Sequence, residues 1–184
     1  MTQLIGLYSP APQSGKTFTA SVLEQNGYIT MSFAEPIKRM ATEFIMSFGY
    51  PKEQAVRFVW ASKAEIIPAI KTTARHILQT LGTEWGRNCM SNDIWLDCMM
   101  SRVASHLKNG DSMIVIDDVR FQNEAELIKK MGGEVWMITR PSAQKNTTHK
   151  SEGALDGWAF FDQVIVNDGT IFDFRAKIDK VVGC

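Results

Sequence analysis

The stretch Gln13-Ser14-Gly15-Lys16-Thr17 constrains the fold of this chain more than any other feature. It follows the apolar run Leu4–Tyr8, which predicts a strand, and it precedes residues 18–23, whose apolar spacing is helical. A strand, a loop ending in Gly-Lys-Thr and a helix are the context that a phosphate-binding loop (P-loop) requires. In such a loop the N–H groups at the helix start converge on phosphate oxygens, and the helix dipole favours their charge. The alternative is a helix N-terminus that spells these residues without binding phosphate.

The residue types in this loop suit phosphate chemistry, with one departure. The Lys16 ammonium would reach the outer phosphates of a nucleotide, and the Thr17 hydroxyl would coordinate Mg²⁺. The usual pattern has glycine where this chain has Pro10, and Pro12 follows, so two loop positions offer no N–H group. We therefore expect the amides from Gln13 to Thr17 to form the phosphate cradle, with the upstream residues as a stiff lead-in.

Composition narrows the class of protein. The 184 residues include 20 Lys+Arg and 20 Asp+Glu, so the formal net charge is zero, which argues against bulk nucleic-acid binding. Three cysteines without C-x-x-C spacing predict a reducing compartment and neither a disulfide framework nor a zinc site. The start of the chain lacks a signal-peptide pattern, and no apolar run approaches the roughly 18 residues that cross a bilayer. We expect a cytoplasmic protein without a membrane partner.

Strand-like and helix-like segments alternate along the chain, which predicts a three-layer α/β fold: about five parallel strands with helices on both faces. The expected strands are Leu4–Tyr8, Tyr28–Phe33, Met113–Asp117, Val135–Thr139 and Val164–Val166. The expected helices are Gly15 to about Asn26, Ala34–Phe48, Gln54–Ala61, Thr73–Leu81, Asp93–Leu107, Glu124–Met131 and Thr170–Val182. In the last of these helices, Thr170 and Asp173 have the spacing of a capping box.

Two regions depart from the alternation. The middle third, about Gly49 to Gly110, shows no convincing strand, and residues of about 34–110 predict a helical insertion. Such insertions commonly supply a substrate pocket in α/β proteins. Residues of about 140–157 are polar and irregular, which predicts a mobile lid loop. We expect both to belong to a single domain of residues 1–184.

The strand Met113–Asp117 ends in two acids, Asp117 and Asp118, at the edge of the sheet where ligands bind in such folds. An acidic residue at this place helps to hold Mg²⁺ in P-loop proteins, and only one of two adjacent acids faces the phosphates. Asp118 and Arg120 are two apart and hence share one side of an extended segment. The pair suits a site where arginine clamps a phosphoryl group and aspartate supports the metal; the alternative is a simple salt bridge.

Further polar residues surround an expected turn at Leu81-Gly82-Thr83, and they are Arg75, Gln79, Glu84 and Arg87. Two arginines beside a glycine turn could read a phosphate and a sugar or base edge, or they could be solvated surface charge. Phe33, at a strand end, and Trp95, at a helix start, could stack on a base or pack in the core.

With these segments in place, the chain resembles the phage-type deoxynucleoside monophosphate kinases, a branch of the P-loop nucleotide kinases. Besides the P-loop, four blocks carry the resemblance in the family's order. They are residues 32–38 (SFAEPIK), residues 75–84 (RHILQTLGTE) with Arg87 and Trp95, residues 118–126 (DVRFQNEAE), and residues 149–152 (HKSE) followed by 167–170 (NDGT). The second and third blocks are far more specific than Gly-Lys-Thr.

The resemblance implies Mg²⁺-dependent transfer of a phosphoryl group from ATP to a 2′-deoxynucleoside 5′-monophosphate, in the cytoplasm, or the host cytoplasm for a phage protein. The implied catalytic residues are Lys16, Asp118 and Arg120, with Thr17 and Asp118 toward the metal. The implied ATP site comprises Gln13, Ser14, Gly15, Lys16, Thr17, Arg140 and Asn167. The implied acceptor site comprises Phe33, Lys38, Arg75, Gln79, Gly82, Thr83, Arg87, Trp95 and Arg120, and the implied lid carries His149, Lys150 and Glu152.

Two other functions stay open from the residues alone. A different small-molecule P-loop kinase, similar to dephospho-coenzyme A kinase, would use the same sheet and loop but leaves the block around Arg75 and Arg87 unexplained. A non-catalytic nucleotide-binding module would account for Pro10 and Pro12. The implied partners are ATP and deoxynucleoside monophosphates, not nucleic acid, and a homodimer remains an open option.

Overall fold

The computed structural model describes residues 3–143, 155 and 157–183. They divide into two compact units, which we call the sheet unit (Met1–Ser32 and Met100–Cys184) and the helical unit (Phe33–Met99). Helix α5 (Ile94–Lys108) contributes residues 94–99 to the helical unit and residues 100–108 to the sheet unit. The helical unit ends inside α5, and the expected helical acceptor-binding region of about 34–110 stays a prediction.

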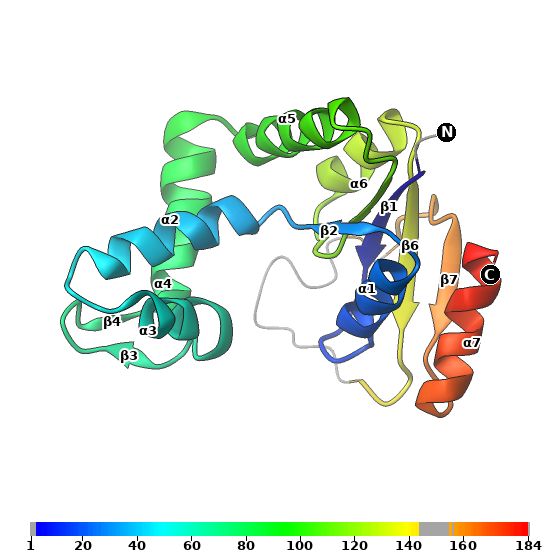
Figure 1. The fold of residues 1–184 in the computed structure, drawn as a ribbon, viewed down its shortest axis with the longest axis horizontal. Helices are drawn as coiled ribbons and strands as arrows, with labels where there is room; N and C mark the ends of the chain where they lie inside the picture. The colour runs from blue at the N-terminus through cyan, green and yellow to red at the C-terminus, as the bar shows by residue number, and fades with distance from the viewer. Residues whose placement is uncertain (1–2, 144–154, 156, 184) are drawn as a thin grey trace. The chain divides into compact units, whose positions relative to one another are not determined.

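The sheet unit is built on five parallel strands in the order β2-β5-β1-β6-β7 (Figure 1). They are β1 (Gln3–Tyr8), β2 (Ile29–Met31), β5 (Met113–Ile116), β6 (Glu134–Thr139) and β7 (Gln163–Val166). The central strand β1 pairs with β5 on one side and β6 on the other, and its last five residues are buried. An apolar run suits a strand that is covered on both faces. The predicted parallel sheet is confirmed.

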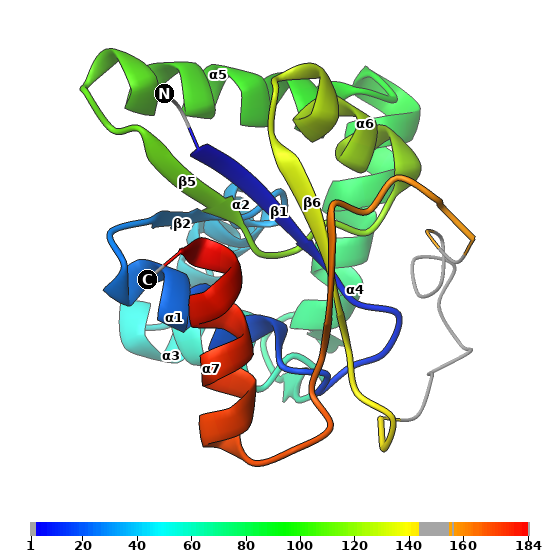
Figure 2. The ribbon, with the colours of Figure 1, turned by 90° about the vertical axis from the view of Figure 1, so that its right-hand side faces the viewer.

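Helices cover both faces of this sheet, as predicted for a three-layer α/β fold. Helices α1 (Lys16–Gln25) and α7 (Ile171–Val182) pack together on one face, whereas α6 (Gln122–Lys130) packs against β1 and β6 on the other (Figure 2). The core between the sheet and the α1–α7 layer includes Leu23, Val115, Trp136, Phe174 and Ile178. Because all five strands are parallel, their carboxyl ends meet at one edge, where the loop after β1 also lies.

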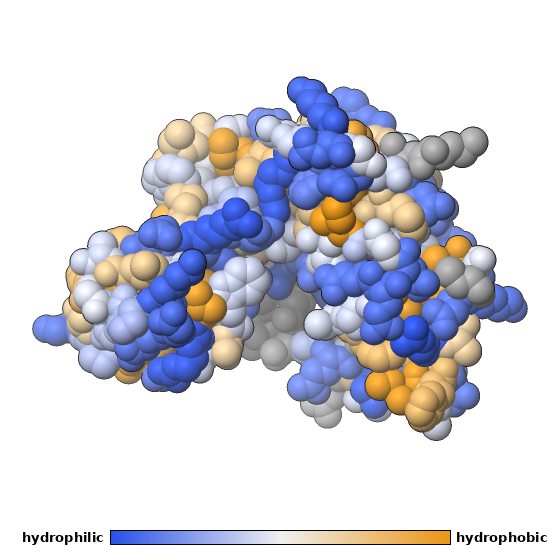
Figure 3. Space-filling view, in the orientation of Figure 1, coloured by the Kyte–Doolittle hydropathy of each residue, from blue (hydrophilic) through white to orange (hydrophobic). Residues whose placement is uncertain are grey.

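Helix α7 is amphipathic, and its start is defined by side chains. Phe174 and Ile178 are buried, whereas Ile171 and Phe172 are 59% and 81% exposed. Figure 3 shows apolar surface over the start of α7. The predicted capping box is confirmed: Asp173 N donates to Thr170 Oγ1 (3.2 Å), and Thr170 N donates to Asp173 Oδ2 (2.9 Å). The two reciprocal bonds satisfy N–H groups that the helix itself leaves open.

The helical unit has its own core. Its elements are α2 (Glu35–Met46), α3 (Lys52–Val56), the π-helix η1 (Arg57–Ala61), the strands β3 (Ile66–Ile67) and β4 (Thr72–Thr73), α4 (Ala74–Gln79) and the π-helix η2 (Thr80–Met90). Buried side chains from most of these elements pack together, among them Ala41, Ile45, Phe58, Ile67 and Ile77. Within the described ranges of both units, no helix has the length and apolar character of a membrane span.

The hairpin of β3 and β4 corrects the prediction that the middle third contains no strand. Ile66 pairs with Thr73 and Ile67 with Thr72 in antiparallel register. Strands of two residues are too short to show an alternating pattern, so periodicity could not reveal them. The turn between them depends on Lys71, which has a positive φ of 55°, and on its N–H bond to Ile67 O (2.9 Å).

The predicted turn at Leu81-Gly82-Thr83 is wrong, because these residues lie inside η2. The helix of α4 continues into η2, just as α3 continues into η1. At the ends of the π-helices, Ser62 N donates to Arg57 O (2.9 Å) and Ser91 N donates to Gly86 O (3.1 Å), each five residues back. Because π-helices longer than one turn are rare, helix propensity and glycine placement favour a break here instead.

Candidate active site

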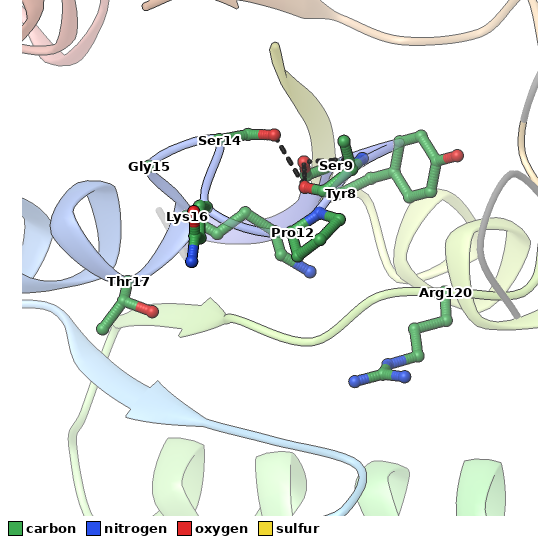
Figure 4. A pocket seen from close by; sticks show the side chains of 10 residues that line it. Tyr8, Ser9, Pro12, Ser14, Gly15, Lys16, Thr17 and Arg120 are labelled. Carbon is green, nitrogen blue, oxygen red and sulfur yellow. Dashed lines mark hydrogen bonds between the residues drawn. The ribbon is translucent and has the colours of Figure 1, made fainter. Parts of the chain in front are cut away.

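The loop between β1 and α1 borders a pocket of about 360 Å³ in the sheet unit (Figure 4). Its lining residues are Tyr8, Ser9, Ala11, Pro12, Gln13, Ser14, Gly15, Lys16 and Thr17, together with Arg120 from the segment between β5 and α6. In Figure 4 the guanidinium end of Arg120 is turned toward the side of the pocket where Lys16 and Thr17 lie. The Gly-Lys-Thr loop and Arg120, 103 residues after Thr17 in the chain (120 − 17), thus share one cavity.

The backbone of this loop has the conformation of an anion-binding nest. Gln13 and Gly15 have positive φ angles of 59° and 113°, and Ser14 between them does not. Left- and right-handed residues in alternation form a concavity of N–H groups that suits phosphate. A side chain at position 15 is excluded twice, because a Cβ would lie 2.7 Å from Phe174 Cε1 and 3.0 Å from Asn167 Nδ2. A positive φ at Gln13 is uncommon for a residue other than glycine, as at other strained functional loops.

Side-chain hydrogen bonds hold the loop in this shape. The Ala11 carbonyl accepts from Ser9 Oγ (2.7 Å) and from Ser14 Oγ (2.7 Å), and Ser14 is almost fully buried. Asn167 Nδ2, at the end of β7, donates to Ser14 O (3.1 Å). The left-handed residues of this loop are Gln13 and Gly15 rather than residue 10, so Pro10 occupies a position where no positive φ is needed.

Lys16 is the half-buried cation of the pocket. Burial lowers the pKa of Lys16 below its ordinary value, and the positive charge of Arg120 lowers it further. The negative charges of Asp118, Asp117 and Glu124 act in the opposite direction, in that order of size. The two cations repel each other in a partly dry environment, so an anionic ligand that lies between them relieves both costs.

Asp118 and Arg120 flank Val119 in the segment that follows β5. Val119 is fully buried and within reach of Gly6 on β1, whereas Asp118 is half-buried and Arg120 is exposed. Asp117 N donates to Met31 O (3.0 Å), which continues the pairing of β5 with β2 past the end of the strand. The chain therefore leaves the sheet at Asp118.

Arg140 and Asn167 follow the carboxyl ends of β6 and β7. Asn167 N donates to Thr139 O (2.7 Å), and its side chain binds the P-loop carbonyl of Ser14, so Asn167 acts on the loop itself. Arg140 is exposed, and its Nε donates to Ser142 Oγ (3.1 Å). The expected lid residues His149, Lys150 and Glu152 lie outside the described residues.

In the helical unit, two of the expected aromatic residues are buried. Phe33 is 5% exposed and Trp95 is 6% exposed. Trp95 Nε1 donates to Gly82 O (2.7 Å), and its ring leaves no room for a side chain at Gly86, where a Cβ would lie 2.5 Å from Trp95 Cζ2. Lys38 Nζ lies 4.1 Å from the centroid of the Trp60 ring, a cation–π contact. Trp95 thus restrains η2 through its hydrogen bond to Gly82 and its packing against Gly86.

The π-helix aligns the expected acceptor residues of α4 and η2. Arg75, Gln79 and Thr83 are exposed, Arg87 is half-buried, and the four are spaced four residues apart. In an α-helix of 3.6 residues per turn such a spacing drifts by about 40° per step in one direction. A π-helix has i→i+5 bonds and about 4.4 residues per turn, so the drift reverses by about 30° per step. The four side chains therefore share one face, which an uninterrupted α-helix would twist apart.

Sequence reasoning missed the supporting residues of the site. It assigned no role to Phe174, to Ser9, or to Glu124, a buried carboxylate at the start of α6. Glu124 is the third residue of α6, which is a capping position, but the predicted helix began at Glu124 itself, so this capping signal was hidden. The contacts of Phe174 and Ser9 have no local signature.

Comparison with known proteins shows the family of this chain. Residues 44–178 match the family model of the deoxynucleotide monophosphate kinases. A protein of Acanthamoeba polyphaga mimivirus that carries the name of a deoxynucleotide monophosphate kinase is 34% identical over 191 residues, with 97% of this chain and 95% of that protein covered. The deoxynucleoside-5′-monophosphate kinase of Escherichia phage T5 is 35% identical over 101 residues, 51% of this chain and 39% of the phage enzyme. The deoxynucleotide monophosphate kinase of Escherichia phage RB69 is 26% identical over 111 residues, which cover 59% of this chain and 44% of the phage enzyme.

Solved structures share the fold. The dephospho-CoA kinase of Campylobacter jejuni has a TM-score of 0.57 at 14% identity, with 100% of this chain and 96% of that chain covered. TT1252 of Thermus thermophilus has a TM-score of 0.55 at 14% identity, with 99% and 97% covered. These identities show the fold alone. The family match over residues 44–178 and the mimivirus relative over nearly the whole length go further: the chain belongs to the deoxynucleotide monophosphate kinase family and is a nucleotide-binding transferase.

Proposed function

We propose that this protein catalyses the transfer of the γ-phosphoryl group of ATP to 2′-deoxynucleoside 5′-monophosphates, which yields the diphosphates. The observation that carries the proposal is the shared pocket of the Gly15-Lys16-Thr17 loop and Arg120 in a chain of this family. Its place of action would be the cytoplasm, the host's in the case of a phage protein.

The donor site is proposed at the loop after β1. The amides of Gln13 to Thr17 would bind the ATP phosphates, and the Lys16 and Arg120 side chains would neutralise the oxygens of the transferred group. Arg140 would add positive charge near ATP, and Asn167 would contribute by holding Ser14 in place. The negatively charged phosphates would lie between the Lys16 and Arg120 side chains and so reduce the repulsion between these two cations.

Thr17 lines the pocket, whereas Asp118 is not one of its lining residues but is near enough for its charge to act on Lys16. A hydroxyl and a carboxylate of this kind fit Mg²⁺. Among the described residues, no cluster of three or more His, Cys, Asp or Glu side chains could hold a metal alone. Magnesium instead prefers one or two protein oxygens together with waters and nucleotide phosphates, and the Thr17 hydroxyl and the Asp118 carboxylate would provide them. When bound, the ion would neutralise charge on the phosphate oxygens.

The acceptor site is proposed in the helical unit. Arg75, Gln79, Thr83 and Arg87 on the common face of α4 and η2 would bind the monophosphate, the arginines through its phosphate. Lys38 would add a further cation. Phe33, Gly82 and Trp95 would shape the site from beneath, since both aromatic rings are buried.

Phosphoryl transfer requires these residues to position the reactants and to stabilise charge, with little covalent chemistry of their own. One acceptor phosphate oxygen attacks the γ-phosphorus, the bond to the β–γ bridging oxygen breaks, and ADP leaves. The attacking oxygen is already largely ionised at neutral pH, so a strong general base is unnecessary. Asp118 would orient the reactants or support the metal, while Lys16 and Arg120 hold the two anions in line.

The reaction is tested by coupled ADP-release assays with Mg-ATP and each of dAMP, dGMP, dCMP and dTMP. We expect turnover with at least one of them and none with dephospho-coenzyme A, while Lys16→Ala abolishes turnover. ATP-dependent thermal stabilisation without turnover on any acceptor would instead identify a nucleotide-binding module. Turnover on dephospho-coenzyme A alone would identify the other small-molecule kinase.

Replacement of Arg120 tests its role at the phosphates. Arg120→Ala removes a charge-assisted contact that is made in the transition state, worth about 1.5–3 kcal/mol, so we expect kcat to fall at least about tenfold. The matched control is Arg175→Ala, because Arg175 is a half-exposed arginine on α7 that pairs with Asp179 on the same helix. Near-normal kcat for Arg120→Ala would reassign that arginine to a structural ion pair.

Replacement of Trp95 tests the support of the acceptor face. Trp95→Phe keeps a ring beside Gly86 but loses the bond to Gly82 O, so η2 loses one restraint. We expect the KM for the monophosphate to rise about 3–10-fold, the value of one hydrogen bond, with less change in the KM for ATP. Trp85→Phe is the control, because Trp85 lies in the same π-helix and is 40% exposed. Equal effects of the two changes on both KM values would contradict this role for Trp95.

The lowered pKa of Lys16 makes a prediction about stability. The folded chain holds the Lys16 proton less tightly than the unfolded chain, whose lysine titrates near 10.5, so stability rises with pH between the lowered pKa and 10.5. Below that window the protonated lysine destabilises the fold. Lys16→Met should therefore keep or raise the Tm at pH 7, with a difference that shrinks as the pH approaches 10.5.

The Lys16→Met measurement is thermal unfolding without nucleotide from pH 7 to pH 10.5. The control is Lys177→Met, because Lys177 Nζ donates to Val166 O (2.9 Å) and to Asp168, and its loss should lower the Tm. A clearly lower Tm for Lys16→Met at pH 7 would identify Lys16 as a structural lysine.

A further inference from the structure

Glu124 is a buried carboxylate next to the phosphoryl-transfer site. The buried polar side chains among the described residues are Ser14, Thr19, Thr42 and Glu124, and only Glu124 is charged, at 3% exposed. Burying a carboxylate is costly unless hydrogen bonds and nearby charges compensate it. Part of the compensation is a capping box, in which the Glu124 side chain accepts from the backbone at the N-cap of α6.

The contacts of Glu124 lead directly to Arg120. Its Oε2 accepts from Arg120 N (2.8 Å) and from Phe121 N (3.1 Å), the two amides that precede α6. Glu124 stands in the first turn of α6, where the helix dipole favours negative charge. The carboxylate therefore fixes the backbone from which the Arg120 side chain extends to the pocket. A side chain on an anchored backbone loses less freedom when it binds a phosphate.

The charge of Glu124 also reaches the donor loop. It is one of three acids whose negative charge acts on Lys16, after Asp118 and Asp117. The other two belong to the segment at the end of β5, whereas Glu124 belongs to α6 and is shielded from solvent. A buried charge is screened less by water and salt than an exposed one.

We propose that Glu124 is a positioning residue of the kinase: its buried carboxylate anchors the Arg120 backbone and balances part of the positive charge that Lys16 and Arg120 bring to the pocket. The inference rests on the proposed function, because Arg120 matters only if the pocket binds a nucleotide phosphate. Glu124 itself touches no reactant. It acts through Arg120, and its removal should matter less when the Arg120 side chain is absent.

A double-mutant cycle of Glu124→Ala and Arg120→Ala tests this coupling. In the unaltered background we expect Glu124→Ala to lower kcat by about tenfold, with a smaller change in the KM for the monophosphate. In the Arg120→Ala background the same change should lower kcat by less than about threefold. The same factor in both backgrounds would show that Glu124 stabilises the fold only, and would overturn the proposal.

A second variant separates hydrogen bonding from charge. Glu124→Gln keeps an oxygen that accepts from both amides but removes the negative charge. This variant replaces Glu124→Ala in the double-mutant cycle if the alanine variant does not fold. We expect a loss of kcat between those of the alanine variant and the unaltered protein, again smaller without Arg120. The control is Glu126→Gln, two residues on in α6, because Glu126 is exposed and accepts from Gln122 on the surface of the same helix (2.6 Å).

ATP binding gives a readout that does not need turnover. The ATP-dependent rise in Tm, measured on the same four proteins of the cycle, should be reduced by Glu124→Ala when Arg120 is present and unchanged when it is absent. If no deoxynucleotide is turned over, the proposed reaction fails while this coupling can still hold. If coupling is missing from both readouts, the role of Glu124 is refuted whatever the reaction is.

Discussion

The close packing around Gly15 is the constraint on which the site depends. A Cβ at this position would lie 2.7 Å from Phe174, and Asn167 binds the neighbouring carbonyl of Ser14. Phe174 and Asn167 lie in α7 and just after β7, so the loop after the first strand is shaped by the last strand and helix. The order β1-β6-β7 within the sheet makes this possible. In the folded chain, the loop after β1 is therefore held by residues from the end of the sequence.

The second theme of the structure is the pair of positive charges, those of Lys16 and Arg120, that one pocket gathers. Lys16 and Arg120 line one pocket, and burial makes the charge of Lys16 costly. Asp118 and Asp117 compensate it from the end of β5, and Glu124 from α6. Two cations that repel each other in one pocket would both be stabilised by an anion that lies between them.

Much of the sheet unit could be predicted because its signals are local. The apolar run of β1, the Gly-Lys-Thr loop and the start of α1 occupy consecutive residues, and the capping box of Thr170 and Asp173 spans four. Parallel strands joined by helices then bring the end of β1 and the segment that carries Arg120 to one edge. The mismatch at Pro10 proved compatible with the loop, because Gln13 and Gly15 take the left-handed conformations.

By itself, then, the sequence determined the α/β class, the parallel sheet, the strand–loop–helix context of the Gly-Lys-Thr loop and the family of this protein, because each is carried by contiguous residues or by ordered motifs. Only the tertiary structure decided the π-helix η2 and the hydrogen bonds of Trp95, Asn167 and Glu124. The hydrogen bonds of Trp95 and Asn167 join residues 13 and 153 positions apart. No local pattern encodes contacts of that range, since they exist only after the chain has folded.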